Sequence, residues 1–263
     1  MSEKNRDGKR SARERLAVER EKQKAADRRR RALIVGASVV CVLGLAAVVG
    51  VVAANAGKDS KKSDSSGPVV SPSGAQGKDA LAIPVGKDSA KSTLTVWEDF
   101  RCPACQSFET NYRSTVHDLV DSGDLRVEYH LVTIIDGNMG GTGSRRAANA
   151  AACAQDAGKF TAYHDVLYEN QPQESDDAFA DNGKLIDLAG KAKGLDTPAF
   201  RTCVNDGTHD SWVDKSSKAF STSGFNGTPT VLLGGKNIYA DRSMTPAKLK
   251  EQVLAANKKA GQG

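Results

Sequence analysis

VWEDFRCPACQSFE, residues 96–109, decides the fold, because it places two cysteines between a strand-like stretch and a helix-like stretch. Residues 92–100 alternate and are rich in β-branched and aromatic side chains, which predicts a strand. After the cysteines, apolar residues recur at helical spacing from Phe108 to Val120, and Gly123 is expected to end this helix. The predicted order is therefore strand, Cys-x-x-Cys turn and helix.

The chain downstream continues the α/β pattern. Residues 125–136 predict a second strand, which the intervening helix allows to lie parallel to the first, as in a βαβ unit. Residues 137–143 are glycine-rich without the spacing of a phosphate-binding loop, so we expect a connection there. Helical patterns fill residues 144–223, and a hairpin over residues 228–240 precedes a last helix capped by Thr245. These patterns alone predict helices packed on a mixed sheet.

The basic charge of the chain belongs to its N-terminal tail. Residues 1–31 contain 13 Lys/Arg and 6 Asp/Glu, a balance of +7, whereas the whole chain has a net charge of +5. The remaining residues therefore have a balance of −2, which gives no reason to expect nucleic-acid binding. We interpret the tail as a solvated cytoplasmic segment that helps to set membrane topology, with binding to a lipid surface as the alternative.

An uncharged stretch of 23 residues, 32–54, follows four consecutive arginines. As a helix it would be about 34 Å long, enough to cross a hydrocarbon core of about 30 Å. By the positive-inside rule, we expect a single-pass protein of the cell membrane with its N-terminus in the cytoplasm and its C-terminal part outside. The alternative is a cleaved signal peptide with its cleavage site at residues 54–56, although the apolar stretch is longer than usual for one.

A change of composition separates this stretch from the folded part of the chain. Residues 55–80 are rich in Ser, Gly, Lys and Pro and poor in large apolar side chains, which predicts a flexible linker. The folded domain is therefore expected to span residues 81–263, with a helical insertion at about residues 144–223.

The five cysteines limit the kinds of site that the chain can form. Cys41 lies in the apolar stretch and is expected only to pack there. A structural zinc site needs four ligands, but the chain has one Cys-x-x-Cys motif, Cys153 and Cys203 stand alone 50 residues apart, and the four histidines show no paired spacing. We therefore expect no metal site.

The position of Cys102 at the first turn of a helix favours redox chemistry. Unpaired backbone N–H groups and the helix dipole stabilise a thiolate there, which lowers the pKa of the thiol and makes it a good leaving group. Cys105, one turn along, is expected to be better shielded and to attack a mixed disulfide formed at Cys102. Pro103 suits the first helical turn because it lacks an N–H. The alternative is a static disulfide between the two cysteines.

The stretches VWEDFRCPACQSFE and NGTPTVLLGG, with the helices between them, resemble the DsbA-type thiol-disulfide oxidoreductases of the thioredoxin superfamily over roughly residues 80–260. The resemblance extends to membrane-anchored actinobacterial members, and it implies an α/β thioredoxin fold with an inserted helical subdomain and no cofactor. It also implies that Thr228 and Pro229 form a cis-proline loop whose backbone docks an extended substrate. Some relatives carry a second disulfide where Cys153 and Cys203 fall, so we expect these two to be joined; two free buried thiols are the alternative.

One position departs from the pattern of the superfamily. Many thioredoxin-like proteins have a buried acid six residues before the first cysteine, where this chain has Val96. Glu98 and Asp99 are the nearest carboxylates, and Asp99 is at a position that is often acidic in DsbA-like relatives. We expect the two acids to shape the electrostatic field around the cysteine pair, with proton relay as the alternative.

Together these features predict a membrane-tethered oxidase that passes a disulfide between Cys102 and Cys105 to reduced exported proteins. Reoxidation would need a membrane redox partner, and the resemblance implies one of the vitamin K epoxide reductase type. A disulfide isomerase or reductase of the same fold is the alternative within this class of enzyme. A binding or chaperone module whose disulfide does not turn over is the alternative outside it.

Overall fold

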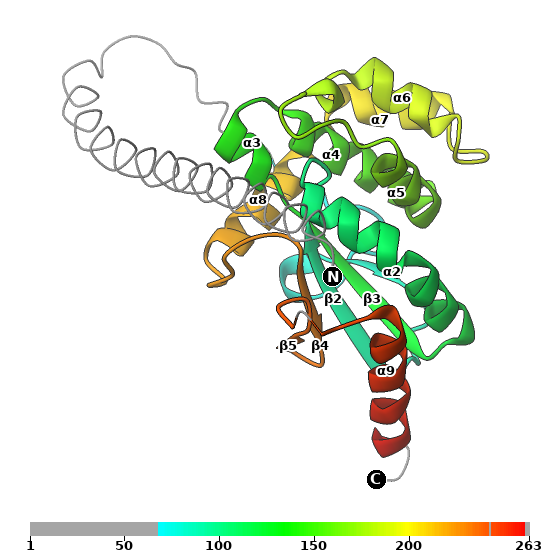
Figure 1. Ribbon diagram of the computed structural model, residues 1–263. Helices are drawn as coiled ribbons and strands as arrows, with labels where there is room; N and C mark the ends of the chain where they lie inside the picture. The colour runs from blue at the N-terminus through cyan, green and yellow to red at the C-terminus, as the bar shows by residue number, and fades with distance from the viewer. Residues whose placement is uncertain (1–67, 242, 261–263) are drawn as a thin grey trace, which may run out of the picture. The chain divides into compact units, whose positions relative to one another are not determined.

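The structure is a computed structural model that describes residues 68–241 and 243–260 (Figure 1). The predicted basic tail (1–31), the predicted transmembrane helix (32–54) and the first part of the predicted linker lie outside the described residues. None of the helices in the described part of the chain combines the length and the apolar composition that crossing a membrane requires.

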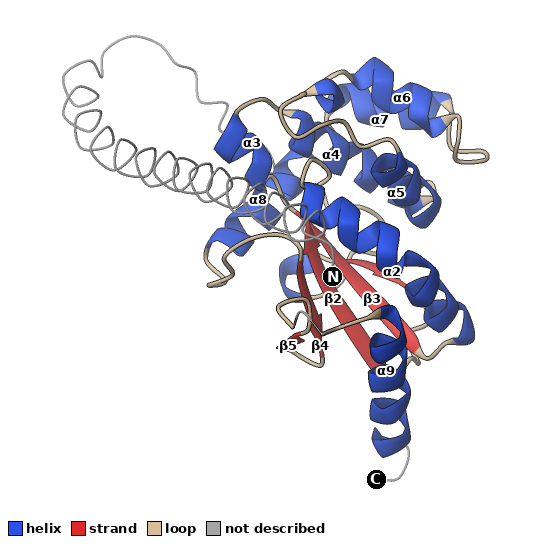
Figure 2. Cartoon of the chain, in the orientation of Figure 1, coloured by secondary structure: helices blue, strands red, loops and turns tan. Residues whose placement is uncertain are grey.

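Five strands of the described residues form one mixed sheet (Figure 2), in the order β1-β3-β2-β4-β5. Their bounds are β1 Ile83–Val85, β2 Ser92–Glu98, β3 Leu125–Leu131, β4 Thr230–Leu233 and β5 Lys236–Asn237. β2 is parallel to β3, which confirms the predicted βαβ unit, and the other strand pairs are antiparallel. The predicted hairpin is confirmed by β4 and β5, whereas the short strand β1 has no clear pattern in the sequence.

One face of this sheet carries the main helices of the fold. Alternation along β2 buries Leu94, Val96 and Glu98 on one side of the strand. Helices α2 (Pro103–Ser122) and α9 (Pro246–Ala260) cover this side and lie next to each other in Figure 1. The carboxyl end of β2 therefore leads directly into the first turn of α2, which is where the Cys-x-x-Cys motif lies.

The boundaries of these helices follow the local signals in the sequence. Gly123 ends α2 in the left-handed conformation, with φ 81°, which glycine adopts at no steric cost. Thr245 caps α9 by accepting a hydrogen bond from Lys248 N at 3.2 Å. Thr197 caps the helix that begins at Pro198 in the same way, through Phe200 N.

The helical insertion lies between β3 and β4; most of it gathers at one end of the sheet, while its last helix packs against β3 (Figure 1). Its α-helices are α3 Ile134–Met139, α4 Gly143–Asp156, α5 Phe160–Glu169, α6 Asn182–Ala189, α7 Pro198–Asp206 and α8 Asp210–Ser221. The sequence predicted a strand over residues 125–136 and a connection over residues 137–143, and both ranges are too long. β3 ends at Leu131, and α3 occupies residues 134–139. Ile135 N donates to Asp99 Oδ2 at 2.9 Å, so a carboxylate at the end of β2 holds the start of this short helix.

Residues 68–80 belong to the predicted linker, but the structure shows them packed on the insertion. His209 Nδ1 lies 2.9 Å from Val70 O, and Trp212 Nε1 donates to Ala80 O at 2.7 Å. The segment is polar enough to suggest a linker, but its backbone carbonyl groups accept hydrogen bonds from side chains at α8. The folded part of the chain therefore begins before the predicted boundary at residue 81.

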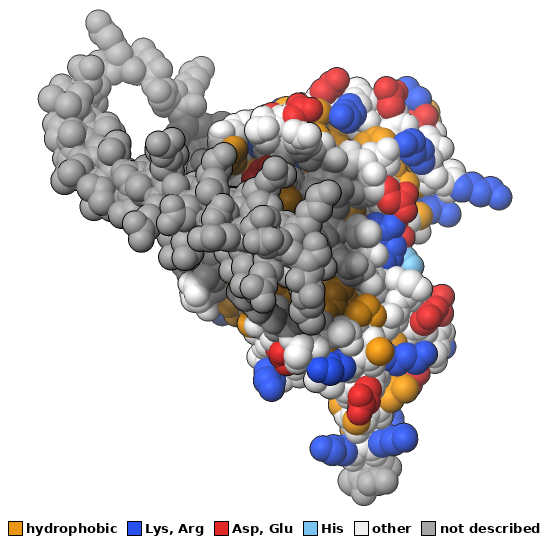
Figure 3. Space-filling view, viewed as in Figure 1, with side chains coloured by type: hydrophobic (Ala, Val, Ile, Leu, Met, Phe, Trp, Pro, Cys, Tyr) orange, Lys and Arg blue, Asp and Glu red, His pale blue; other side chains and the backbone are white. Residues whose placement is uncertain are grey.

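Acidic and basic side chains are intermingled on the visible surface of the described residues (Figure 3). Arg113, for example, lies 3.2 Å from Asp165 and 2.6 Å from Glu169. This mixed surface agrees with the near-neutral charge of the chain beyond its basic tail.

Candidate active site

The structure places the two motif cysteines at the first turn of α2. Cys102 is the residue just before the helix and Pro103 is its first residue, so Cys102 lies at the end where backbone N–H groups are unpaired. Both cysteines are free thiols. Cys102 keeps 6% of its surface exposed and Cys105 keeps none, so an incoming thiolate can reach only the Cys102 sulfur.

The residues predicted to bind substrate lie against the first cysteine. The peptide bond between Thr228 and Pro229 is cis, and Cys102 Sγ lies 3.3 Å from Thr228 O. Pro229 also lines a cavity of about 370 Å³, together with residues 224–227 and Tyr239. The loop before β4 thus places the Thr228 carbonyl beside the Cys102 sulfur and borders an adjoining cavity.

The two thiols have opposite pKa shifts. A hydrogen bond with the Cys105 side chain is the largest cause that lowers the pKa of Cys102 to about 6. Burial opposes it, and hydrogen bonds from the Thr228 side chain and from the backbone N–H groups of Ala104 and Cys105 add to it. Burial raises the pKa of Cys105 well above its ordinary value, and its interactions with Cys102 and the charge of Glu98 raise it further. At pH 7, Cys102 is therefore mostly a thiolate and Cys105 a thiol.

Three ionisable side chains are buried in the core between β2, α2 and α5: Glu98, Glu109 and His164. His164 Nε2 lies 2.7 Å from Glu98 Oε1, while Glu98 Oε2 and Glu109 Oε1 have no hydrogen-bond partner among the described residues. Burial raises the pKa of Glu109 to about 8. Burial would lower the pKa of His164, but the nearby acidic groups, Glu98 first among them, outweigh it and raise this pKa to about 10. Glu98 and His164 therefore form a buried ion pair.

The buried group of Glu98, Glu109 and His164 provides ionisable side chains near the cysteine pair. The superfamily pattern instead has a buried acid at the position of Val96. Val96 is fully buried and apolar, and the charge of Glu98 adds to the effects of burial and of Cys102 in raising the pKa of Cys105. Glu109 lies one helical turn after Cys105, on the buried face of α2, and His164 is on the buried face of α5. Both Glu109 and His164 were missed in the sequence analysis. The signal that could have found them is an ionisable residue at a position of a helix that faces the core.

Asp99 fixes the turn that leads into the motif. Its Oδ1 accepts a hydrogen bond from Arg101 N at 2.8 Å, its Oδ2 accepts one from Ile135 N at 2.9 Å, and its carbonyl accepts one from Cys102 N at 3.0 Å. Burial raises the pKa of Asp99 to about 7, although these hydrogen bonds oppose the shift. The Asp99 carboxylate therefore ties the end of β2 to the start of α3, and its backbone carbonyl holds the first cysteine.

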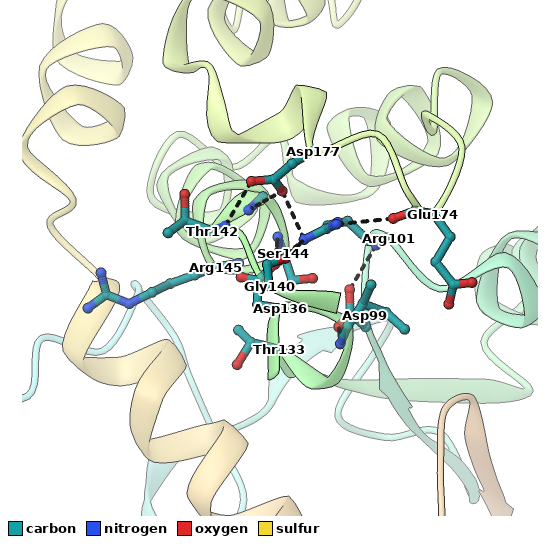
Figure 4. A network of polar contacts seen from close by, with 12 residues as sticks. Asp99, Arg101, Thr133, Asp136, Gly140, Thr142, Ser144, Arg145, Glu174 and Asp177 are labelled. Atoms are coloured by element: carbon teal, nitrogen blue, oxygen red, sulfur yellow. Dashed lines mark hydrogen bonds and ion pairs between the residues drawn. The ribbon is translucent and has the colours of Figure 1, made fainter. Parts of the chain in front are cut away.

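Arg101, immediately before the first cysteine, is a charged residue with only 1% of its surface exposed. Its Nη1 lies 2.7 Å from Asp136 Oδ1 and 2.8 Å from Asp177 Oδ1. The guanidinium also donates to the carbonyl oxygens of Gly140 and Glu174 (Figure 4). The same two carboxylates accept hydrogen bonds from backbone N–H groups at the start of α4. No sequence motif marks Arg101, because its partners lie 35 residues or more away.

The insertion also contacts the backbone of the motif. Gln171 Nε2 lies 2.8 Å from Phe100 O and 3.1 Å from Cys102 O, and it can donate to both. Gln106, in the first turns of α2, donates to Tyr168 O at 3.0 Å. These contacts hold the start of α2 in place, and with it the Cys102 sulfur.

Cys153 on α4 and Cys203 on α7 are joined by a disulfide, with an S–S distance of 2.03 Å. His209 lies near both sulfurs, but its ring nitrogens lie 2.9 Å from Val70 O and 2.8 Å from Asp156 Oδ2. Sulfurs bonded to each other are not thiolates, so they are not metal ligands in this state. The buried histidine and two glutamates of the core are the other candidate ligands among the described residues, and an ion pair already joins two of them.

Comparison with known proteins shows which proteins the chain is similar to. The chain matches the family described as thioredoxin over residues 79–255. It is similar to disulfide bond formation protein D of Bacillus subtilis (strain 168), with 29% identity over 162 residues, 60% of this chain and 70% of that protein. Among solved structures, oxidised DsbA of Mycobacterium tuberculosis has 31% identity and a TM-score of 0.58, covering 66% of this chain and 92% of that one. BdbD from Bacillus subtilis has 26% identity and a TM-score of 0.56, covering 73% of this chain and 100% of that one.

The matched range includes every part of the site described above. It contains the Cys-x-x-Cys motif, the helical insertion and the cis peptide bond before Pro229. A thiolate beside a shielded thiol, at the start of a helix, is also the arrangement that thiol-disulfide exchange requires. The chain therefore belongs to the thioredoxin family and is a DsbA-like thiol-disulfide oxidoreductase.

Proposed function

We propose that this oxidoreductase introduces disulfide bonds into reduced exported proteins through Cys102 and Cys105. The asymmetry of the two thiols carries the proposal, since one is a stabilised thiolate and the other a buried thiol. Stabilising the Cys102 thiolate favours the reduced form of the pair, which makes the oxidised form a stronger oxidant. The direction of electron flow is then from substrate to enzyme.

The reaction starts from the Cys102–Cys105 disulfide and a substrate with two thiols. A substrate thiolate attacks Cys102 Sγ, so an S–S bond forms between substrate and Cys102, and Cys105 leaves and takes up a proton. The second substrate thiolate attacks the substrate sulfur of this mixed disulfide, and Cys102 leaves as a thiolate. Two electrons pass from the substrate dithiol to the cysteine pair; one substrate proton goes to Cys105 and the other to solvent.

Thr228 and Pro229 would dock the substrate segment. Thr228 O lies 3.3 Å from Cys102 Sγ, so a peptide extended along this backbone brings its own cysteine to the reactive sulfur. The cavity lined by Pro229, Phe225 and Tyr239 offers space for a side chain that neighbours the substrate cysteine. Recognition through backbone and one shallow cavity suits an enzyme that accepts many unfolded substrates.

The proposed location is the outer side of the cell membrane, with residues 32–54 as a single transmembrane anchor and the N-terminus in the cytoplasm. The uncharged stretch and the four arginines before it support this topology. The disulfide between Cys153 and Cys203 also suits an oxidising compartment. Protease added to intact protoplasts should remove the domain and spare the tail of residues 1–31. Protection of the domain would contradict this topology.

Repeated turnover requires a partner that removes two electrons from the reduced pair. We propose a membrane redox protein, such as one of the vitamin K epoxide reductase type, which would receive these electrons and regenerate the Cys102–Cys105 disulfide. A tether at residues 32–54 would keep the domain near such a partner.

Oxidative refolding of a reduced, disulfide-containing protein tests the proposal. The oxidised wild type should restore substrate disulfides, whereas Cys102→Ala and Cys105→Ala should each give only the background rate, because neither variant can form the Cys102–Cys105 disulfide that accepts the two electrons. Cys41→Ala, which removes a thiol outside the motif, is the matched control and should match the wild type. Equal rates for the wild type and Cys102→Ala would contradict the proposal and favour a binding or chaperone module whose disulfide does not turn over.

The reduction potential separates an oxidase from a reductase or isomerase of the same fold. The lowered pKa of Cys102 favours an oxidising pair, so we expect a potential above about −200 mV. A value near about −270 mV, typical of thioredoxin, would instead indicate a reductase. Equilibration with glutathione buffers, followed by mass spectrometry of alkylated Cys102, gives the value.

A further inference from the structure

A second cavity, of about 550 Å³, lies on the side of the sheet away from α2. It is enclosed by α8, by the short helix η1 (Lys78–Ala80) and by the ends of β2 and β3. Its volume is within the range of about 300–1,000 Å³ that is usual for small-molecule sites. None of its lining residues belongs to the cavity beside Pro229 or to the cysteine motif.

Two flat rings form the floor of this cavity. Trp97 and His130 are register partners on the parallel strands β2 and β3, so their side chains leave the sheet next to each other. Their ring centroids are 3.9 Å apart and their planes differ by 10°. Burial lowers the pKa of His130 to about 4, so the imidazole is neutral at pH 7. Each ring therefore covers one face of the other, and together they give the cavity an uncharged aromatic floor, at which Trp97 is only half-buried.

Lysines surround the mouth of the cavity. Lys78 comes from η1, and Lys215 and Lys218 come from α8. Asp79 is the one carboxylate in the lining, and it pairs with Lys215 at 3.7 Å. The ionisable groups thus leave a positive balance, and within the described residues no ion pair involves Lys78 or Lys218.

An aromatic floor and a positively charged mouth together favour a ligand that has both an aromatic ring and a negative charge. A planar ring can pack against the free edge of the indole, in the edge-to-face arrangement that aromatic pairs favour, and cover the exposed part of Trp97. A carboxylate, sulfonate or phosphate on that ring would lie near the ammonium groups of Lys78 and Lys218, where it gains charge-assisted hydrogen bonds. An uncharged ring would gain only the first contribution, and a cation would be repelled.

We propose that this cavity is a second binding site, which takes a small planar aromatic anion. The loop after α8 separates it from the cavity beside Pro229. Thr222 and Ser223 line the new site, whereas Phe225, two residues on, lines the other cavity and packs on Trp97 with ring centroids 6.1 Å apart. The two sites therefore lie on opposite sides of one short loop.

Isothermal titration calorimetry with naphthalene-2-sulfonate tests the site, using the full-length chain in detergent micelles and empty micelles as the blank. The wild type should show saturable binding of one molecule per chain. Naphthalene-2-methanol, which has the same ring system without the charge, should bind at least fivefold more weakly. No saturable binding by the wild type, or equal affinity for the two compounds, would overturn the proposal.

Charge reversal locates the binding. The double variant Lys78→Glu/Lys218→Glu should bind naphthalene-2-sulfonate at least tenfold more weakly. Lys248→Glu/Lys250→Glu makes the same change of charge at exposed positions on α9, and its affinity should stay within twofold of the wild type. Equal weakening in both double variants would mean that the anion responds only to net charge, and no weakening in the first would place it elsewhere. Trp97→Phe, which keeps a ring at the floor, should bind more tightly than Trp97→Ala.

Discussion

Cys102 and Cys105 remain free thiols at the start of a helix, whereas Cys153 and Cys203 are joined inside the helical insertion. The first pair is three residues apart and keeps one sulfur within reach of solvent. The second pair closes a loop of 50 residues, and a closed loop of that length restricts the unfolded chain strongly. The two cysteine pairs therefore differ in use because they differ in position and in separation along the chain. One pair exchanges electrons, and the other restrains the chain.

Removal of the second pair should have the larger effect on stability. Cys153→Ala/Cys203→Ala should lower the free energy of unfolding by about 4 kcal/mol, the value for a loop of this length in the chain-entropy model. At 25 °C the rate of substrate oxidation should stay close to that of the wild type, because neither residue contacts the motif. Urea unfolding and the refolding assay measure the two quantities. A loss below about 1 kcal/mol, or loss of oxidation in a folded variant, would break the contrast between the pairs.

The reduced first pair should make stability depend on pH. The pKa of Cys102 is about 6 in the folded protein, against an ordinary value of 9.0. A lowered pKa stabilises the folded state because the thiolate is favoured there. This stabilisation is complete at pH values above the ordinary pKa of 9.0, partial at pH 7, and lost once the pH falls below about 6. The expected contribution is about 1 kcal/mol at pH 7 and close to zero at pH 5.

Urea unfolding of the reduced wild type and of reduced Cys102→Ser, at both pH values, measures this contribution. The difference between the two proteins cancels the titration of Asp99 and Glu109, which changes stability in this range as well. A difference that does not grow between pH 5 and pH 7 would contradict the thiolate assignment.

The smallest expected effect concerns how the two thiols of the motif influence each other. Cys105→Ala removes the hydrogen bond that contributes most to the lowered pKa of Cys102, so this pKa should rise. Cys105→Ser keeps a donor at the same place and should raise it less. Thiolate absorbance at 240 nm, in a Cys41→Ala background, follows the titration. Equal midpoints in the two variants would show that the helix terminus alone sets the pKa.

Local sequence signals predicted the elements next to the motif. The strand, the helix with its glycine end, the parallel second strand and the final hairpin all follow from periodicity and from cap residues near in sequence. The errors occur where distant groups decide the structure. Residues 134–136 fit a strand by composition, but a hydrogen bond to Asp99 starts a helix there. Residues 68–80 fit a linker, but groups on α8 order them.

The same distinction applies to the site. Cys102 and Cys105 are recognisable because their spacing is local, and Thr228 and Pro229 are recognisable only through the resemblance to a family. The buried partners Glu109 and His164 come from different helices, and only the folded chain brings them next to Glu98. Periodicity could have flagged each of the two as a charged residue on an apolar face, but it could not have paired them.

The buried guanidinium of Arg101 has a consequence for how the domain can be rebuilt. An insertion within a fold is often treated as a module that can be exchanged or shortened. Here the module carries Asp136 and Asp177, which neutralise a charge that belongs to the parent scaffold. A chimaera that takes its insertion from another protein must therefore bring both carboxylates with it, or replace Arg101 at the same time.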